Sequence, residues 1–337
     1  MKLWSVAHRL HEFGLLGMNG RNADYISQVN ARRFYPLVDD KLLTKQLATK
    51  AGLATPELYA TFNVSAEIRH ARERLDKYDS FVVKPANGSR GNGILVIKGR
   101  IGDNLRLASH RVMTWYDLRF HMQNMLSGIY SLGGQDDHVI VEYCVEFDRV
   151  FDSITHLGVP DIRLIAYKGV PVMGMVRLPT TASEGKANLH QGAIGAGIDL
   201  ATGRTLTAVW RNSVVKQHPD TLADVTGVQI PLFDRMLDIA AGCNEMTNLG
   251  YVGVDLVLDR TKGPLMLELN ARPGLNIQIA NRAGLGARLE AVDRADAGSL
   301  PRAERIAFAK EMFGIGGNLD AKSAAADRSP SIPAWPL

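Results

Sequence analysis

Three oxygen-bearing side chains in two neighbouring apolar segments could hold a divalent cation. Glu268 and Asn270 are two residues apart in a run typical of a strand, so their side chains share one face. If residues 259–264 form a hairpin with a four-residue loop, Asp255 faces Glu268 on the same side. Carboxylate and amide oxygens are hard donors that suit Mg²⁺. The alternative is that all three are solvent-facing strand positions, which is the usual place of a lone carboxylate.

A glycine-rich segment at residues 81–97 could bind phosphate. Gly88, Gly91 and Gly93 would let backbone N–H groups approach an anion, and Lys84 at a strand end would add a positive charge. The segment lacks Gly-Lys-Ser/Thr and is followed by a strand rather than a helix, so it is neither a Walker loop nor a dinucleotide-binding turn. A plain turn between two strands is the alternative interpretation.

Apolar periodicity indicates the elements that must position these groups. Strands are expected at 81–84, 94–98, 139–143, 161–168, 170–177, 251–258 and 265–269, and helices at 39–52, 65–78, 115–129 and 232–246. Residues 179–197 show no period, and an irregular segment this long within a compact domain is usually functional. Residues 318–337 have the composition of a low-complexity tail.

Composition and charge exclude several classes of protein. The 39 Lys and Arg residues against 35 Asp and Glu leave a net charge of only +4, which does not indicate nucleic-acid binding. No run of about 18 apolar residues is present, so no membrane span is expected. Cys144 and Cys243 form neither a disulfide framework nor a metal set, which favours a reducing compartment, and we expect a cytoplasmic protein.

Further motifs occur in a fixed order around the lysine, the glycines and the acidic triplet. They are Asp40-Lys41, Val-Val-Lys84-Pro, Val-Ile-Val-Glu142-Tyr143, Asp161-Ile-Arg163, Lys186-Ala-Asn188-Leu-His190, Gly253-Val-Asp255 and Leu-Glu268-Leu-Asn270-Ala-Arg-Pro-Gly274. From about Asp39 to Leu289 the chain resembles the ATP-grasp superfamily, and more closely its alpha-L-glutamate ligase-like branch, which is related to the ribosomal-protein glutamate ligases.

This resemblance implies an α+β fold in which two lobes with antiparallel sheets clamp ATP. The implied division is a shortened N-terminal region at 1–38, a small lobe with a glycine-rich flap at 39–140, a large lobe with the metal site at 141–317, and a flexible tail at 318–337. Because the N-terminal lobe is shortened, we expect a homo-oligomer or a partner to cover the edge that this lobe would otherwise cover.

The resemblance also implies a role for each matching residue. The expected phosphate contacts are Lys41, Lys84, Gly88, Ser89, Gly91 and Gly93; the expected adenine contacts are Glu142 and Tyr143, with Asp161 near the nucleotide; the expected catalytic residues are Arg163, Lys186 and Asn188; the expected ligands of Mg²⁺, or of Mn²⁺ as the alternative ion, are Asp255, Glu268 and Asn270. Plainer alternatives exist for three positions: Tyr143 as a core residue, Arg163 as a surface ion pair and His190 as a loop histidine. The ribose contact is left open among Glu146, Asp148 and Asp152.

The implied activity is ATP-dependent ligation of a carboxylate to an amine through an acyl phosphate, with release of ADP and phosphate. The amine would be glutamate or another amino acid, and the carboxylate acceptor would be a small molecule, a peptide or a protein. Two alternatives stay open, a phosphotransferase built on the same nucleotide site and a nucleotide-binding scaffold without turnover. Neither a nucleic acid nor a membrane is an expected partner.

Overall fold

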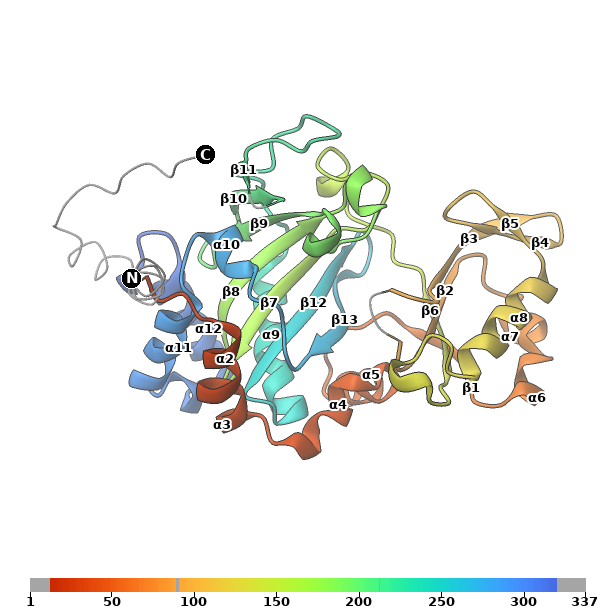
Figure 1. Cartoon of the computed structure of the whole chain (residues 1–337), viewed down its shortest axis with the longest axis horizontal. Helices are drawn as coiled ribbons and strands as arrows, with labels where there is room; N and C mark the ends of the chain where they lie inside the picture. The colour runs from red at the N-terminus through yellow and green to blue at the C-terminus, as the bar shows by residue number, and fades with distance from the viewer. Residues whose placement is uncertain (1–12, 89–90, 212, 320–337) are drawn as a thin grey trace, which may run out of the picture. The chain divides into compact units, whose positions relative to one another are not determined.

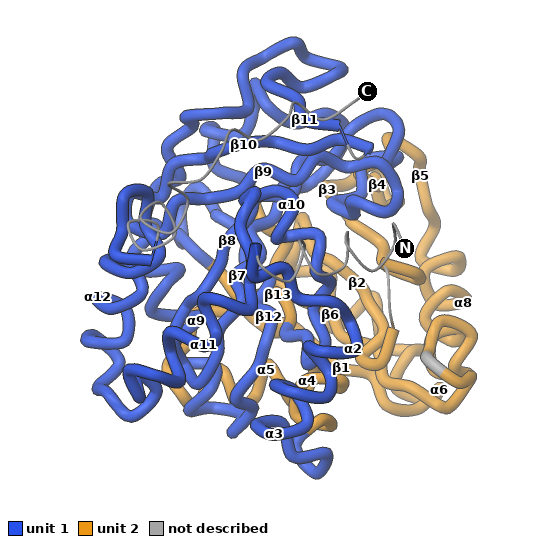
Figure 2. The backbone as a smooth tube through the Cα atoms, turned by 60° about the vertical axis from the view of Figure 1, so that its left-hand side comes forward, with its two compact units in different colours: residues 1–34, 147–264, 269–337 blue, residues 35–146, 265–268 orange. Residues whose placement is uncertain are grey.

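The computed structural model describes residues 13–88, 91–211 and 213–319. Figure 2 colours its two compact units. Unit 1 comprises Met1–Phe34, Phe147–Pro264 and Leu269–Leu337, and unit 2 comprises Tyr35–Glu146 and Leu265–Glu268. The predicted lobes, 39–140 and 141–317, divide the chain at nearby places, whereas the short piece 265–268 groups with unit 2. Most of the predicted tail lies outside the described residues.

Unit 2 is built on a six-stranded antiparallel sheet with the order β1-β6-β2-β3-β4-β5. The strands are β1 (Leu58–Phe62), β2 (Phe81–Pro85), β3 (Leu95–Ile101), β4 (Asn104–Leu107), β5 (Val112–Met113) and β6 (Val139–Tyr143). Val82 pairs with Glu142, and Lys84 pairs with Ile140. Because side chains alternate along a strand, Lys84 and Glu142 lie on one face of the sheet, and Phe81 lies on the other.

Helices pack against the Phe81 face and form the core of unit 2. They are α6 (Ser65–Ile68), α7 (Ala71–Leu75) and α8 (Trp115–Leu126), and their buried residues join those of the strands in one cluster. The helix predicted at 65–78 is therefore two short helices. The helix predicted at 115–129 ends at Leu126, because Gly128 adopts a φ of 77° that stops it. Ile129, which the apolar pattern placed in that helix, is 65% exposed.

A seven-stranded sheet with the order β11-β10-β9-β8-β7-β12-β13 lies in unit 1, except for residues 265–268 of β13, which group with unit 2. The strands are β7 (Asp161–Tyr167), β8 (Val170–Leu178), β9 (Ile194–Ile198), β10 (Thr205–Trp210), β11 (Ser213–Val215), β12 (Tyr251–Asp259) and β13 (Gly263–Asn270). Asp161 pairs with Arg177, and Asp255 pairs with Arg163. These four side chains therefore share one face of the sheet.

Helices cover both faces of the unit 1 sheet. They are α9 (Phe233–Thr247), α10 (Ile277–Asn281), α11 (Leu285–Arg294) and α12 (Arg302–Phe313), with short helices η4 (Arg149–Phe151) and η7 (Ala297–Ser299). Helix α9 packs against β7 and β12 and lies behind the sheet in Figure 1, whereas α10 packs against β8, β9 and β10 in front of it. Within the described residues, no helix has the length and apolar character that a membrane span requires.

The first segment of unit 1, which precedes unit 2 in the chain, packs on later parts of unit 1. Its helices are α2 (Met18–Gly20), η1 (Arg21–Ile26), α3 (Ser27–Val29) and η2 (Arg32–Phe34). Gln278 accepts a hydrogen bond from the backbone N–H of Leu16 at 2.8 Å and donates to its carbonyl at 3.0 Å. Asn30 makes the same two-way contact with the backbone of Tyr251, at 2.7 and 2.8 Å. Residues 16–30 are thus fixed to segments more than two hundred positions later in the chain.

Candidate nucleotide and metal site

Two buried lysines enclose Glu142 on the polar face of the unit 2 sheet. Nζ of Lys84 lies 2.5 Å from Oε1 of Glu142, and Nζ of Lys45 lies 2.9 Å from Oε2. Lys45 also donates to the hydroxyl of Thr55 at 3.1 Å and to the carbonyl oxygen of Pro56. Glu142 is only 3% exposed. Two ammonium groups against one carboxylate leave a positive charge, which an anionic ligand can neutralise.

Burial and ion pairing act in opposite directions on the pKa values of this cluster. Burial would raise the pKa of Glu142, but the ammonium groups of Lys84 and Lys45 outweigh it and hold that pKa below its ordinary value. Burial lowers the pKa of Lys45, and the carboxylate of Glu142 opposes that effect. Glu142 is therefore ionised at neutral pH and supports the charge of the lysine beside it.

Helix α5 (Lys41–Lys50), which follows the short α4 (Pro36–Asp39), contributes a third lysine. The side chain of Asp40 accepts hydrogen bonds from two N–H groups of the first turn, at 2.8 and 3.0 Å, which confirms the predicted helix start. Nζ of Lys41 lies 2.5 Å from the carbonyl oxygen of Gly88. Burial lowers the pKa of Lys41, whereas the carboxylate of Glu268 raises it. Lys41 thus reaches the glycine segment and interacts with a predicted metal ligand.

The glycine segment has positions that no larger residue could occupy without strain. A Cβ at Gly88 would lie 2.3 Å from Cγ of Pro85, and one at Gly93 would lie 2.6 Å from a tyrosine ring. Gly91 and Gly93 also have φ values of 76° and 77°, where L side chains are strained. Ser89 lies outside the described residues. The chain path therefore requires these glycines, and their contact with phosphate stays a prediction.

Strand β6 directs its last two side chains to opposite faces of the sheet. Glu142 lies in the lysine cluster, whereas Tyr143 pairs with Phe81 and shares its face. The backbone N–H of Tyr143 donates to the carbonyl oxygen of Glu57 at 2.8 Å. Glu142 and Tyr143 therefore present their side chains to opposite faces, and the predicted adenine contact stays a prediction.

Four charged side chains form a row across β8, β7 and β12 of unit 1. Nε and Nη2 of Arg163 lie 2.7 and 2.5 Å from the two carboxylate oxygens of Asp255. Arg177 makes the same two-point contact with Asp161, and its Nη2 also lies 2.9 Å from Oδ2 of Asp255. All four side chains are largely buried, and Asp255 is 2% exposed. Two positive and two negative charges alternate and balance.

Position in the row gives the two carboxylates different pKa values. Burial would raise the pKa of Asp255, but Arg163 and Arg177 outweigh it and hold that pKa far below its usual range. Burial raises the pKa of Asp161 to about 6, because Arg177 opposes it only in part and the Asp255 carboxylate adds to it. Asp255 therefore keeps its charge at neutral pH, and of the two carboxylates Asp161 binds a proton more readily.

Two glycines of β9 let other segments approach the face that carries this row. Gly195 pairs with Arg177, and a Cβ there would lie 2.7 Å from the side chain of Leu189. A Cβ at Gly197 would lie 2.7 Å from the carbonyl oxygen of Ala280 in α10. The segment around Leu189 and helix α10 therefore lie directly against the charged face.

Gly197→Ala is expected to destabilise unit 1 by about 1–3 kcal/mol, because the added methyl group would meet backbone atoms of α10. The measurement is the free energy of unfolding from urea titration. Gly274→Ala is the matched control, since a Cβ there meets no atom within 4 Å. Equal stability of the Gly197 variant and wild type would show that α10 can move away from the sheet at no cost.

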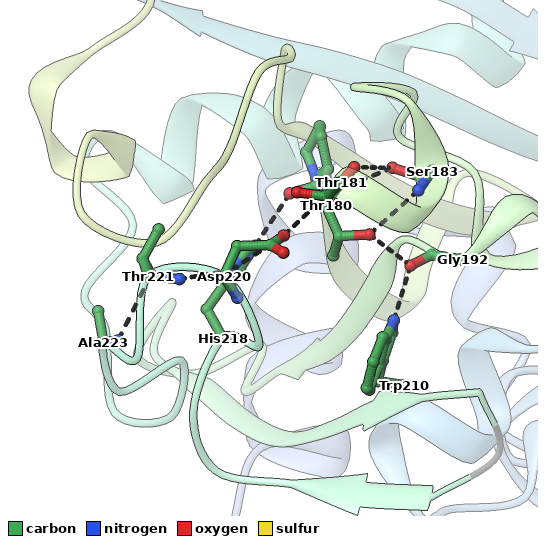
Figure 3. A network of polar contacts seen from close by, with 10 residues as sticks. Thr180, Thr181, Ser183, Gly192, Trp210, His218, Asp220, Thr221 and Ala223 are labelled. Carbon is green, nitrogen blue, oxygen red and sulfur yellow. Dashed lines mark hydrogen bonds and ion pairs between the residues drawn. The ribbon is translucent and has the colours of Figure 1, made fainter.

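A polar network holds the loop that the sequence left without periodicity (Figure 3). The last part of the predicted irregular stretch, Ile194–Ile198, is strand β9. The hydroxyl of Thr180 and the indole N–H of Trp210 both donate to the carbonyl oxygen of Gly192, each at 2.8 Å. His218 is fully buried with Nε2 2.9 Å from the carbonyl oxygen of Pro179, and Asp220 accepts from a loop N–H at 2.8 Å. The two ends of the loop are thus fixed.

Two predicted catalytic residues lie on this loop, away from its fixed ends. Lys186 follows η5 (Thr181–Ser183), is exposed, and has its Nζ 3.7 Å from a carboxylate oxygen of Glu184. Asn188 begins η6 (Leu189–Gln191), and its side-chain oxygen accepts from the N–H of His190 at 3.0 Å. His190 is exposed, in line with its plainer interpretation as a loop histidine. The catalytic roles of Lys186 and Asn188 stay predictions.

The three predicted metal ligands lie on the neighbouring strands β12 and β13. Glu268 and Asn270 are two apart on β13, so they point to the same side of that strand. A Cβ at Gly253 would lie 3.6 Å from the carbonyl oxygen of Asn270, which places Asn270 beside the part of β12 that leads to Asp255. Among the described residues, no three His, Cys, Asp or Glu side chains gather where they could hold a metal ion.

This donor set fits Mg²⁺ that is shared with a nucleotide rather than enclosed by protein. Mg²⁺ is usually held by one or two carboxylates together with substrate phosphates and water. A carboxylate has about four acceptor sites, and the two arginines use three of those on Asp255. Among the described residues, these contacts leave one acceptor site on Oδ1 of Asp255. With Glu268 and the amide oxygen of Asn270, it would supply hard oxygen donors of the kind that Mg²⁺ prefers.

Sequence reasoning missed two charged residues of these clusters. Lys45 is one helical turn after Lys41, and Arg177 lies opposite Asp161 across the turn between β7 and β8. Only Lys45 had a detectable signal, because a spacing of four residues places two lysines on one side of a helix. A two-residue turn at Lys168-Gly169 would place Asp161 opposite Val176, and the irregularity between Ile165 and Ala166 shifts the register by one so that Arg177 lies opposite Asp161.

Comparison with known families agrees with the fold. A family described as sugar-transfer associated ATP-grasp matches residues 20–294. The chain belongs to this family. The predicted ATP-grasp fold, α+β with two antiparallel sheets, is thereby confirmed. The glutamate-ligase branch stays a prediction. No curated protein sequence matches the chain.

Solved structures with low sequence identity align with this ATP-grasp chain. ATP-grasp ligase PsnB with its minimal precursor is 14% identical, with a TM-score of 0.41 over 80% of this chain and 64% of that one. D-cycloserine synthetase DcsG is 17% identical, with a TM-score of 0.44 over 79% of this chain and 73% of that one. The D-alanine–D-alanine ligase of Bacillus anthracis in complex with ATP is 13% identical, with a TM-score of 0.38 over 87% of this chain and 69% of that one. The chain thus spans less than two thirds of PsnB.

Proposed function

We propose that this protein is an ATP-dependent ligase that joins a carboxylate to an amine and releases ADP and phosphate. The observation that carries the proposal is the lysine cluster of unit 2. The ammonium groups of Lys45 and Lys84 share one buried carboxylate, and Lys41 contacts the first glycine of the flap. Buried ammonium groups beside a glycine-rich turn form an environment that stabilises phosphate oxygens.

In this proposal Lys41, Lys45 and Lys84 bind the phosphates, and Glu142 holds Lys45 and Lys84 in place. Burial lowers the pKa values of Lys41 and Lys45, so a nucleotide phosphate would replace part of the solvation that burial has removed from these two ammonium groups. Mg²⁺, held by Asp255, Glu268 and Asn270, would neutralise phosphate charge when bound. This interpretation explains why the cluster lies on the polar face of its sheet, away from the core.

Arg163 and Arg177 would stabilise negative charge on the reacting groups. The guanidinium groups of Arg163 and Arg177 each present two parallel N–H donors to a carboxylate. Each guanidinium group has five N–H donors, and those that these contacts do not use would fit the oxygens of a phosphoryl group or an acyl phosphate. The carboxylate acceptor would attack the γ-phosphorus, and the amine would then displace phosphate from the acyl carbon. This chemistry depends on positioned cations more than on a general base.

Amino acids and peptides are the first candidates for the two substrates. We infer glutamate or another amino acid as the amine donor, and a small-molecule, peptide or protein carboxylate as the acceptor, from the resemblance to glutamate ligases. The family description, sugar-transfer associated, adds acids and amines that carry a sugar. It also favours a second candidate function, phosphoryl transfer to a sugar hydroxyl.

ADP release with a panel of these acids and amines, followed by mass spectrometry of the products, tests the proposal. With the correct acid and with hydroxylamine in place of the amine, we expect a hydroxamate and ADP, because hydroxylamine captures an acyl phosphate. A phosphorylated alcohol without hydroxamate would assign the protein to the phosphotransferases. AMP as the nucleotide product would exclude the acyl-phosphate route, and nucleotide binding without any turnover would favour a scaffold.

A further inference from the structure

A buried carboxylate outside the predicted site holds the stem of the glycine segment. Asp137 is 3% exposed and lies just before β6. Its Oδ1 and Oδ2 accept the backbone N–H of Asn87 at 3.0 and 3.1 Å, and Oδ1 also accepts the side-chain amide of Asn87 at 3.0 Å. The hydroxyl of Ser131 donates to Oδ2, and the N–H of His138 donates to Oδ1 at 2.7 Å.

These hydrogen bonds join three segments that are separate in the sequence. Asn87 follows β2, Ser131 lies just before η3 (Leu132–Gly134), and His138 leads into β6. Two backbone contacts reinforce the arrangement: the N–H of Ala86 donates to the carbonyl of His138 at 2.9 Å, and Gly88 forms a bridge with Ser131. Since Asn87 is enclosed by bonds to one carboxylate, its backbone has little freedom to rotate.

The fixed position of Asn87 affects Lys41 through one further contact, and Asn87 also lies close to Lys84 in the chain. The residue after Asn87 is Gly88, whose carbonyl oxygen accepts from Nζ of Lys41 at 2.5 Å. Lys84, which forms an ion pair with Glu142, lies three residues before Asn87. The carboxylate of Asp137 also raises the pKa of Lys41 against the larger effect of burial. Asp137 therefore acts on Lys41 both through the chain and through its charge.

We propose that Asp137 is a positioning residue for nucleotide binding, which fixes Asn87 and so presents the Gly88 carbonyl to the Lys41 ammonium group. The inference rests on the proposed function, because it requires Lys41 to bind the nucleotide. It differs from a purely structural role in one respect. Loss of the carboxylate should weaken nucleotide binding in molecules that remain folded, and the loss should depend on Lys41.

Calorimetric titration of the full chain with Mg·ADP tests this inference. Asp137→Asn replaces one acceptor oxygen by an NH₂ group that faces N–H donors, and we expect about tenfold weaker binding below the unfolding temperature, the effect of losing a charged hydrogen bond. In a Lys41→Ala background the same change should weaken binding by less than about threefold, because the group it positions is absent. Asn87→Ala keeps the backbone bonds and should have a smaller effect of about twofold to threefold.

Asp199→Asn is the matched control. Asp199 is also a buried carboxylate, which accepts from the N–H groups of Ala201 and Ile315 at 3.2 and 3.0 Å, but it lies in unit 1. This variant should be less stable yet bind Mg·ADP as wild type does.

Wild-type affinity of the folded Asp137→Asn variant for Mg·ADP would overturn the inference. An equal loss of affinity in the wild-type and Lys41→Ala backgrounds would also overturn it. If Asp137→Asn does not fold, wild-type affinity of Asn87→Ala overturns it. Failure of the wild-type chain to bind Mg·ADP would instead overturn the proposed function.

Discussion

The Asp255→Asn variant is expected to lose both turnover and stability. The substitution leaves the buried guanidinium group of Arg163 without a carboxylate partner and removes one of the two carboxylates that contact Arg177. Breaking a buried ion pair in this way costs about 3–5 kcal/mol. ADP release should fall by at least about a hundredfold, since the variant also removes a carboxylate that we propose as a ligand of Mg²⁺. Urea titration and an ADP assay under identical conditions measure the two effects.

Glu268→Gln is the matched control, because Glu268 is only half-buried and lies outside the arginine row. It should lower turnover while leaving the free energy of unfolding close to that of wild type. If Asp255→Asn keeps wild-type stability, the four-residue row contributes nothing to the fold. If Glu268→Gln keeps wild-type activity at every magnesium concentration, Glu268 is not a metal ligand.

The Glu142→Gln variant is expected to show a comparable loss of stability in unit 2. Two ammonium groups, from Lys45 and Lys84, would remain buried beside a neutral amide. A buried charge without its partner costs about 3–5 kcal/mol. Affinity for Mg·ATP should also fall, since Glu142 holds Lys84 in place. Glu73→Gln, which removes an exposed carboxylate of the same unit, should change neither the free energy of unfolding nor affinity.

Acid should reduce the difference between wild type and Glu142→Gln. The pKa of Glu142 in the folded protein lies below its ordinary value of 4.5. The unfolded chain therefore binds the proton first, and the stability that the carboxylate provides is fully present above pH 4.5 and is lost as pH falls through the lower, folded value. Urea titrations between neutral pH and acid should show the two unfolding free energies converging. A constant difference down to the lowest pH would contradict the role of this ion pair.

Apolar patterning predicts the elements around the site because these elements are buried on at least one face. Strands β2, β6, β12 and β13 lie within a residue or two of the ranges predicted for them. Their runs of Val, Leu and Ile reflect burial directly. The same apolar patterning predicts helix α8. The helix ends at Leu126 rather than at the predicted residue 129, because Gly128 adopts a positive φ.

Charged pairs are harder to predict because their partners depend on register. Asp161, Arg163 and Asp255 are recognisable as motif residues, but that Asp255 contacts two guanidinium groups follows only from the alignment of β8, β7 and β12. Arg177 by itself looks like a surface arginine. Asp137 is harder still, since its contacts come from three loops with no periodicity. Composition cannot show that a lone aspartate will be enclosed by N–H donors.

Residues 16–30 have a consequence for the order in which the chain folds during synthesis. Their partners are Tyr251, Pro273 and Gln278, which leave the ribosome more than two hundred residues later. Unit 2 is nearly continuous from Tyr35 to Glu146 and can form its sheet much earlier. Since domains generally fold as they emerge and long-range contacts close slowly, this early segment must wait unpaired while unit 2 is completed behind it. Unit 1 is therefore expected to complete its fold after unit 2, when residues 16–30 form their contacts with Tyr251, Pro273 and Gln278.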